Sequence, residues 1–265
     1  MILFSLTRSL FGAKKAYETK DGSASKKAHD GLSAPEKHKF GGEYLKSAVY
    51  GGLDGTITTF AVVAGVTGAA LSPGIVLIMG FANLIGDGIS MAVGDYLSTK
   101  AENDYYDSER AREKWEADNY PDGEKREMVE IYEQKGIPKK DASSIMQILS
   151  RHKEAWVDVM MAEELELIKN NGSPAKNAAV TFISFSIFGF IPLATYVLAI
   201  FFPQIHSNSF AIACTLTACT LFLLGALKSR LTEQNWLISG SQMLAVGSLA
   251  AGAAYIVGVF LSGLA

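Results

Sequence analysis

Four side chains with ligand or hydrogen-bonding chemistry recur at every fourth position of "NLIGDGISMAVGDYLS", residues 83 to 98: Asn83, Asp87, Met91 and Asp95. Residues four apart share one face of an α-helix, so these side chains form a single stripe. The rest of the segment is apolar enough to cross a bilayer, where a carboxylate is rare unless it faces a cavity, a partner or a transported ion. Carboxylate oxygen with thioether sulfur favours a borderline first-row cation over Ca²⁺ or Mg²⁺. The alternative is that Asp87 and Asp95 pair locally and Met91 only packs.

Two further carboxylates belong to the preceding apolar segment. Asp54 sits in the middle of "YGGLDGTITTF", among glycines that leave its side chain accessible. Glu43 lies eleven residues earlier, which is about three helical turns, so it shares the face of Asp54. We predict a translocation path made by Asp54, Asp87 and Met91, with Glu43 near its cytosolic mouth.

A second group of candidate ligands lies between residues 101 and 170. Glutamates recur three or four apart on both sides of the sequence "NYPDGE", and "WVDVMMAEELEL" adds two methionines and another glutamate. A run of glutamates is normally a solvated helix face, but the methionine pair favours a metal site. The candidates are Glu109, Glu113, Glu116, Glu124, Glu127, Met160, Met161 and Glu164.

The distribution of charge indicates a membrane protein. The 265 residues are 49% hydrophobic and 19% charged, yet 18 of the 27 acidic residues fall between Glu102 and Glu166, where residues 101–170 hold 11 basic ones. Such a charged insert between apolar halves is typical of a membrane protein with a soluble domain. The net charge of −3 offers no basic surface for nucleic acid. Cys214 and Cys219 match no disulfide or zinc pattern, and we interpret both as small core residues.

Five apolar segments are long enough to cross the membrane as helices, at about 47–70, 74–97, 178–202, 210–227 and 237–264. The predicted fold class is therefore an all-α membrane protein with five transmembrane helices and a cytosolic helical metal-binding domain between the second and the third. The predicted divisions are a disordered N-terminal tail (1–42), helices one and two (43–100), the acidic domain (101–172) and helices three to five (173–265).

Basic residues set the orientation. All 24 Lys and Arg lie within residues 1–46, 98–177 and 228–236, so these regions are expected in the cytosol and the C-terminus outside it. We expect the bacterial cytoplasmic membrane, with a vacuolar membrane as the alternative. Glycine-rich stretches such as "GSLAAGAA" in the last span predict helix-packing surfaces.

Helix-breaking residues divide the charged segment between the second and third predicted spans. The second span is predicted to continue unbroken from Pro73 to about Asp118, and Pro121 then starts a helix that ends near Gln134, before "KGIP". A third helix is expected over about 139–170, with a break near "SRHKEAW".

Three motifs together resemble the vacuolar iron transporter family: "GGLDGTITTFAVVAGVTGA", "DGISMAVGDYLSTKAEND" and "AWVDVMMAEELEL", within residues 43 to 264. The resemblance implies a homodimer with five spans per subunit and a cytosolic three-helix metal-binding domain. It also implies export of Fe²⁺ from the cytosol, and in some members Mn²⁺ or other divalent metals, in exchange for protons. No enzymatic activity and no cofactor are implied.

The resemblance assigns roles residue by residue. Asp54 and Met91 match translocation ligands, and Glu43 matches an acidic residue at the cytosolic entrance. The plant-type pattern has a glutamate where this chain has Asn83, and a small residue where it has Asp87, which is similar to the prokaryotic branch. The implied cytosolic ligands are Glu113, Glu116, Glu124, Glu127, Met160, Met161 and Glu164.

The sequence thus predicts a transporter of Fe²⁺, or of Mn²⁺, Co²⁺ or Zn²⁺, whose partners are metal ions, protons, membrane lipid and a second copy of the chain. One alternative is a membrane-anchored metal-storage module. A diiron bundle would normally show Glu-x-x-His pairs, and the four histidines form none. The other is a transporter of an organic solute, disfavoured because no inverted repeat or matching pair of broken helices is evident.

Overall fold

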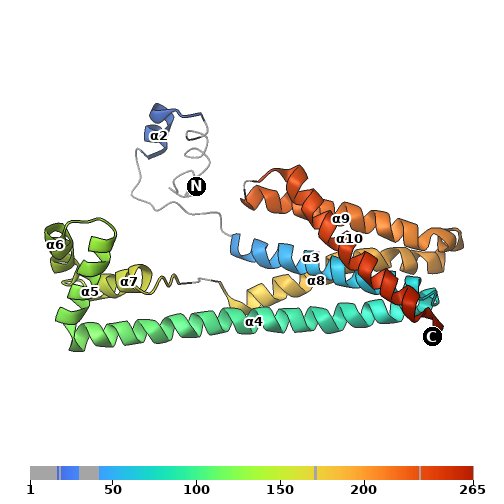
Figure 1. Ribbon diagram of the computed structural model, residues 1–265, viewed down its shortest axis with the longest axis horizontal. Coiled ribbons are helices and arrows are strands. Elements are labelled where there is room, and N and C mark those ends of the chain that lie inside the picture. Colours follow the sequence, from blue (N-terminus) through green and yellow to red (C-terminus); the bar gives the residue numbers. More distant parts are fainter. Residues whose placement is uncertain (1–16, 18, 30–41, 170–171, 233, 265) are drawn as a thin grey trace, which may run out of the picture. The chain divides into compact units, whose positions relative to one another are not determined.

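The computed structural model describes residues 17, 19–29, 42–169, 172–232 and 234–264, and these residues form helices and short connections (Figure 1). The N-terminal region contributes α2 (Gly22–His29). The remaining helices are α3 (Gly42–Gly68), α4 (Pro73–Asn119), α5 (Pro121–Gln134), α6 (Lys139–Leu149), α7 (Lys153–Glu163), α8 (Pro174–Phe201), η1 (Pro203–Asn208), α9 (Ser209–Thr232), α10 (Trp236–Leu261) and η2 (Ser262–Leu264).

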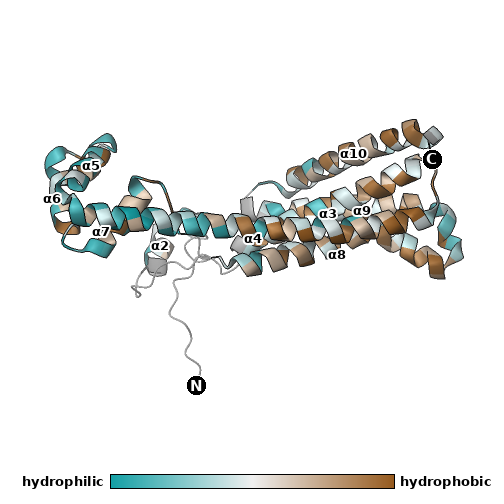
Figure 2. Ribbon diagram, turned by 90° about the horizontal axis from the view of Figure 1, so that it is seen from below, coloured by the Kyte–Doolittle hydropathy of each residue, from teal (hydrophilic) through white to brown (hydrophobic). Residues whose placement is uncertain are grey.

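Five of these segments are long and apolar enough to cross a membrane: α3, α4, α8, η1 with α9, and α10. In Figure 2 hydrophobic residues dominate α8 and α10, whereas α5, α6 and α7 are largely hydrophilic. The acidic helices lie in sequence between the second and third spans. The predicted fold class, a five-span all-α membrane protein with an inserted acidic helical region, is confirmed.

The chain divides into two compact units. The membrane unit comprises residues 1–85 and 183–265, and the acidic unit comprises residues 86–182. The boundaries fall inside α4 and α8, so each of these helices contributes to both units.

The membrane unit is packed through glycines of α3. A Cβ on Gly55 would collide with the backbone of Phe185 in α8, and a Cβ on Gly68 would collide with the backbone of Tyr255 in α10. From the other side, a Cβ on Gly258 of α10 would meet the carbonyl oxygen of Gly65. Backbones approach this closely only where side chains are absent, and dispersion contacts then hold the helices together. The predicted role of the small residues as packing surfaces is confirmed at Gly55 and Gly68 of the first span and at Gly247 of "GSLAAGAA", which lies against Leu221, but not at Gly252 of the same stretch.

The acidic unit follows the predicted breaks. Helix α4 runs unbroken to Asn119, and Pro121 occupies the first turn of α5, where a missing N–H costs nothing. Gly136 ends α5 with a φ of +91°, and the N–H of Ile137 donates to the carbonyl of Tyr132 at 3.0 Å, as in a Schellman motif. The expected third helix is divided into α6 and α7 by residues 150–152.

Two expectations need correction. Helix α7 ends at Glu163 instead of continuing to residue 170. Cys214 is half-buried but Cys219 is exposed, so the interpretation of Cys219 as a core residue is wrong.

We expect Gly258→Ala to lower the thermal unfolding midpoint of the detergent-solubilised protein, because its methyl group must displace the backbone of α3. Overpacking of this kind costs about 1–3 kcal/mol. Gly252→Ala is the matched control on the same helix, since a Cβ there meets no atom within 4 Å. Equal midpoints for the two variants would contradict the close α3–α10 packing.

Candidate metal centre

Three carboxylates from two helices converge in the acidic unit. Glu113 and Glu116 come from α4 and Glu124 from the first turn of α5, and one oxygen of each lies within 4.8 Å of the others. The sharp break at Pro121 turns the chain so that α5 starts beside the end of α4. Glu113 is 0% exposed and Glu124 is 7% exposed. We call Glu113, Glu116, Glu124 and the neighbouring Glu164 the carboxylate cluster.

The buried oxygens of this cluster lack hydrogen bonds. Both carboxylate oxygens of Glu113 and Oε2 of Glu164 are buried without a hydrogen-bond partner among the described residues. Leaving a buried polar group unsatisfied costs about 1–3 kcal/mol, and more for a charged one. A cation bound between these oxygens would remove that cost.

Electrostatics link the members of the cluster. The pKa of Glu113 is raised to about 7 in total, chiefly by burial. The charge of Arg112 lowers this pKa, and the neighbouring carboxylates raise it. Burial likewise raises the pKa of Glu164 to about 7, with contributions from Glu113, Glu127 and Glu124. The pKa of Glu124 is also raised, chiefly by burial. Glu113 and Glu164 therefore take up protons near neutral pH unless a cation replaces them.

The two predicted thioether ligands lie in the core beside this cluster. Met160 and Met161 are fully buried, and they pack in one apolar group with Ala117 and Met128. Ala117 directly follows Glu116, and the backbone N–H of Glu164 donates to the carbonyl of Met160 at 3.0 Å. The methionines thus belong to α7, which packs against α4 and α5, the helices that carry Glu113, Glu116 and Glu124.

This donor set suits a divalent transition metal. Carboxylate oxygens supply charge, and thioether sulfur favours softer ions than Mg²⁺ or Ca²⁺. Glu127, also predicted as a ligand, is exposed and contributes its negative charge to the cluster. Metal binding by these residues stays a prediction.

The predicted path residues are distributed over both units. Asp54 is half-buried on α3 in the membrane unit, and Glu43 lies in the first turn of α3, where its side chain is outside the described part. Asp87 and Met91 are half-buried on the α4 portion of the acidic unit, whereas Ile89 and Val93 of the same helix are exposed. The predicted stripe is therefore more protected than the face that carries Ile89 and Val93, whereas Leu84 and Gly88 of the same helix are buried.

Asp95, at the end of that stripe, is held by a neighbouring helix. The hydroxyl of Thr181 on α8 donates to Oδ2 of Asp95, and one turn away Nδ2 of Asn177 donates to Oγ1 of Thr99 at 3.2 Å. These contacts clamp α4 to α8 within the acidic unit. They favour local pairing, rather than cation transport, as the role of Asp95.

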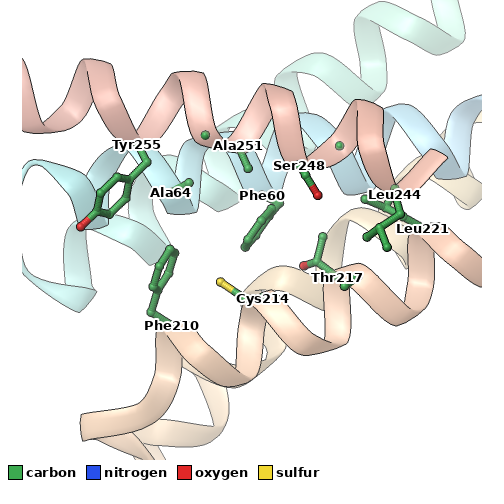
Figure 3. Close-up of a pocket in the computed structure, with 13 residues that line it drawn as sticks. Phe60, Ala64, Phe210, Cys214, Thr217, Leu221, Leu244, Ser248, Ala251 and Tyr255 are labelled. Atoms are coloured by element: carbon green, nitrogen blue, oxygen red, sulfur yellow. The ribbon is translucent and has the colours of Figure 1, made fainter. Parts of the chain in front are cut away.

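The membrane unit contains an apolar cavity of about 400 Å³ between α3, α9 and α10 (Figure 3). Phe60, Phe210 and Tyr255 contribute rings to its wall, and Cys214 and Thr217 are among its polar or polarisable side chains. None of its lining residues is a carboxylate. A dehydrated divalent cation would find no anionic ligand there, so this cavity does not suit metal passage.

Sequence reasoning missed one component of the candidate metal centre, the basic residue Arg112. Its guanidinium forms ion pairs with Glu109, Glu113 and Glu116. The spacing of Arg112 from Glu109 (three residues) and Glu116 (four residues) could have indicated two of these contacts, because such residues are neighbours on a helix.

Comparison with known proteins identifies the family. The family model described as "VIT family" matches residues 45–259, which is most of the chain and includes the cluster and every candidate path residue except Glu43. The chain belongs to the VIT family. The vacuolar iron transporter of Toxoplasma gondii is 40% identical over 96% of this chain and 89% of its own length. That of Plasmodium falciparum is 36% identical over 97% of both chains. Vacuolar iron transporter 1 of Arabidopsis thaliana is 36% identical over 83% of this chain and 87% of its own.

These relatives correct one expectation. Three relatives that match 96–97% of this chain, at 36–40% identity, are apicomplexan vacuolar iron transporters. The assignment to the prokaryotic branch, and with it the bacterial membrane, is not supported. The residues at two positions, Asn83 and Asp87, were not enough to assign the chain to the prokaryotic branch of the family.

We expect Glu113→Gln to have opposite effects with and without metal. The pKa of Glu113 is raised from 4.5 to about 7 in the folded chain, so its contribution to stability is complete below pH 4.5 and lost as pH rises through 7. At pH 8 the metal-free variant should therefore unfold at a higher temperature than the parent. Its free energy of unfolding should exceed that of the parent by at most about 3 kcal/mol. Added Co²⁺ should stabilise the parent but stabilise the variant much less.

Tryptophan fluorescence can follow this unfolding, since Trp156 is buried in the core of the acidic unit. The control is Glu130→Gln, an exposed position on the same helix α5. A metal-free Glu113→Gln protein that is less stable than the parent at pH 8 would show that the carboxylate is structurally required.

Proposed function

We propose that this VIT-family protein moves Fe²⁺ out of the cytosol across a vacuolar-type membrane, in exchange for protons. The observation that carries the proposal is Glu113, a completely buried carboxylate that accepts no hydrogen bond from any described residue and whose oxygen lies within 4.8 Å of two other carboxylates. Iron is favoured as the substrate because the relatives are named vacuolar iron transporters. Mn²⁺, Co²⁺ and Zn²⁺ share the ligand preferences of this donor set and are candidate further substrates.

In this proposal the acidic unit collects the metal. The basic residues place residues 98–177 on the cytosolic side, together with the N-terminus, and leave the C-terminus on the other side. We propose residues 101–172 as the functional metal-binding domain, with residues 43–100 and 173–265 forming the transmembrane part. Glu113, Glu116, Glu124, Glu127, Met160, Met161 and Glu164 would supply the ligands.

The membrane spans would carry the ion. We propose Asp54 and Met91 as translocation ligands, Asp87 as a further carboxylate of the path, and Glu43 as a charge at its cytosolic entrance. The polarity of these side chains in otherwise apolar spans supports these roles. A second copy of the chain would complete a homodimer, as the family resemblance implies.

Protons could drive export through competition for the same carboxylates. A carboxylate that binds a metal must first lose its proton, so metal binding falls as the proton concentration rises. Metal would bind from the neutral cytosol and leave on an acidic side. This exchange needs no chemical conversion of the substrate.

A membrane-anchored storage module is the main alternative function. It accounts for the carboxylate cluster, but it gives no role to Asp54, Asp87 and Met91 in membrane-length helices. Reconstituted protein separates the two functions. Gradient-dependent uptake of Fe²⁺ into sealed liposomes under anaerobic conditions would support transport, and stoichiometric binding without uptake would support storage.

We expect Asp54→Asn and Met91→Ala each to reduce Fe²⁺ uptake to the level of protein-free liposomes, because each removes a ligand from the path. Met79→Ala, an exposed methionine on the same helix α4, should transport normally. Size-exclusion profiles must match the parent for each variant. Normal uptake by Asp54→Asn or Met91→Ala would refute the assignment.

Asp87→Asn should uncouple metal movement from the pH gradient if Asp87 carries the exchanged proton. The amide keeps the size and hydrogen-bonding capacity of the side chain but cannot bind or release a proton in the pH range of the assay. The measurement compares uptake with and without an imposed gradient in the parent, Asp87→Asn and Asn83→Glu/Asp87→Asn. The double variant should recover part of the coupling, since it restores a carboxylate one turn away. Full coupling in Asp87→Asn would leave the proton to another group.

A further inference from the structure

Arg112 lies among the carboxylates of the candidate metal centre. Its Nη2 is 2.8 Å from Oε2 of Glu109 and 2.9 Å from Oε1 of Glu113, and its Nη1 is 3.2 Å from Oε2 of Glu116. The contact with Glu113 is an ion pair without hydrogen-bonding geometry. A single guanidinium thus contacts two cluster carboxylates and one carboxylate outside the cluster.

Nearby basic residues on the same helix have different partners. Arg110 binds Glu154 at 2.9 Å and Asp158 at 2.8 Å, and Lys114 also pairs with Glu154. Glu154 and Asp158 are exposed residues of α7 outside the cluster. These pairs join α4 to α7, whereas all ion pairs of Arg112 are with glutamates of its own helix. Among the described residues Arg112 thus forms no ion pair between helices, although its charge also acts on Glu124 of α5 and on Glu164. Its position needs an explanation other than helix pairing.

We infer that Arg112 is a tethered counter-cation that competes with the metal for Glu113 and Glu116. We also infer that Glu109 holds its guanidinium when the metal is bound. The inference rests on the proposed function, because it concerns the same cluster, but it assigns a role to Arg112 and Glu109, which are both outside the ligand set that the family resemblance implies. Both act on the metal indirectly, through the ligands.

Charge and geometry support this competition. Metal and guanidinium require the same oxygen atoms and repel each other, and in a site shielded from water this repulsion is weakly screened. Glu109 accepts two hydrogen bonds from Arg112, at 3.0 Å from Nε and 2.8 Å from Nη2, so the arginine keeps a partner when it leaves the other carboxylates. Arg112 is about half exposed, which leaves its side chain room to move.

Competition would make the metal easier to release. Without a bound ion, the arginine reduces the mutual repulsion of the carboxylates and stabilises the empty cluster. A metal must displace it, so affinity falls and dissociation becomes faster. This property suits a site that collects ions for transport, whereas a storage site benefits from slow release.

The test is metal binding by the full-length protein in detergent, using Co²⁺ titrated calorimetrically and released into excess chelator in a stopped-flow instrument. The part of the Co²⁺-binding and Co²⁺-release signals that disappears in the double variant Glu113→Gln/Glu116→Gln is assigned to the cluster. We expect Arg112→Gln to bind Co²⁺ at the cluster roughly tenfold more tightly, mainly through slower release. Arg112→Lys keeps the charge and should remain within about threefold of the parent. Arg110→Gln is the matched control and should leave affinity unchanged.

The role of Glu109 is tested by a double-mutant cycle. Glu109→Gln should weaken Co²⁺ binding in the parent, because Arg112 then loses its other partner and stays on Glu113 and Glu116. The same substitution should have a much smaller effect in the Arg112→Gln background. Equal effects in both backgrounds would show that Glu109 acts directly on the metal and would overturn its role as the holding residue.

Three other results are decisive. Weaker binding by Arg112→Gln would make Arg112 a residue that orders the ligands, and unchanged binding would remove it from the site; either overturns competition. If the parent and Glu113→Gln/Glu116→Gln bind Co²⁺ alike, the cluster itself does not bind metal, and the collecting role in the proposed function fails. Failure of the inference is thus distinguishable from failure of the function on which it rests.

Discussion

Mutual repulsion among buried carboxylates is the constraint on which the acidic unit depends. Glu113, Glu116, Glu124 and Glu164 are gathered where water cannot fully solvate them, and buried oxygens of Glu113 and Glu164 accept no hydrogen bond within the described part of the chain. A fold selected only for stability would fill this space with apolar side chains. The protein can keep the arrangement because protons, Arg112 or a metal ion can each compensate the negative charge. Exchange among these three cations is what the site is suited to do.

The surrounding helices make that arrangement possible. The apolar core of α4, α5 and α7 supplies burial, and the ion pairs between α4 and α7 keep those helices together. Close approach through Gly55, Gly68 and Gly258 serves a comparable purpose in the membrane unit, where lipid gives helices no hydrophobic reason to associate. The membrane unit is therefore stabilised by dispersion contacts between closely packed helices. The acidic unit is stabilised by burial of apolar side chains together with ion pairs on its surface.

Local chemistry explains how much of this could be predicted from the sequence. The ends of α4 and α5 were predictable because Pro121 and Gly136 restrict the backbone whatever surrounds them. Apolar length similarly predicted the five spans. The convergence of Glu113 with Glu124 followed from the family resemblance rather than from spacing, since no periodicity links residues across a break. The end of α7 at Glu163 was missed because no proline or glycine marks it.

The partner of a long side chain was harder still to predict. Arg112 has carboxylates three residues before it, one after it and four after it, and only the folded chain shows that one guanidinium contacts all three. Helical periodicity placed Asp95 on the stripe, but Thr181, which binds it, is 86 residues away in sequence. The functions of Asp54, Asp87 and Met91 remain predictions. The position of a polar side chain in an apolar helix indicates a free-energy cost, but it does not identify the ion or group that compensates this cost.

The unbroken length of α4 has a consequence for delivery. Met91 and Glu113 lie on this one helix, 22 residues apart, which corresponds to roughly 33 Å at 1.5 Å per residue. If both residues bind metal as proposed, no ion can contact both at once, so an ion released at one must cross the intervening distance through water. Because a rigid helix does not hold a released ion, the fraction of ions that reaches the second residue falls as this distance grows. Shortening the helix by whole turns would raise that fraction without altering any ligand.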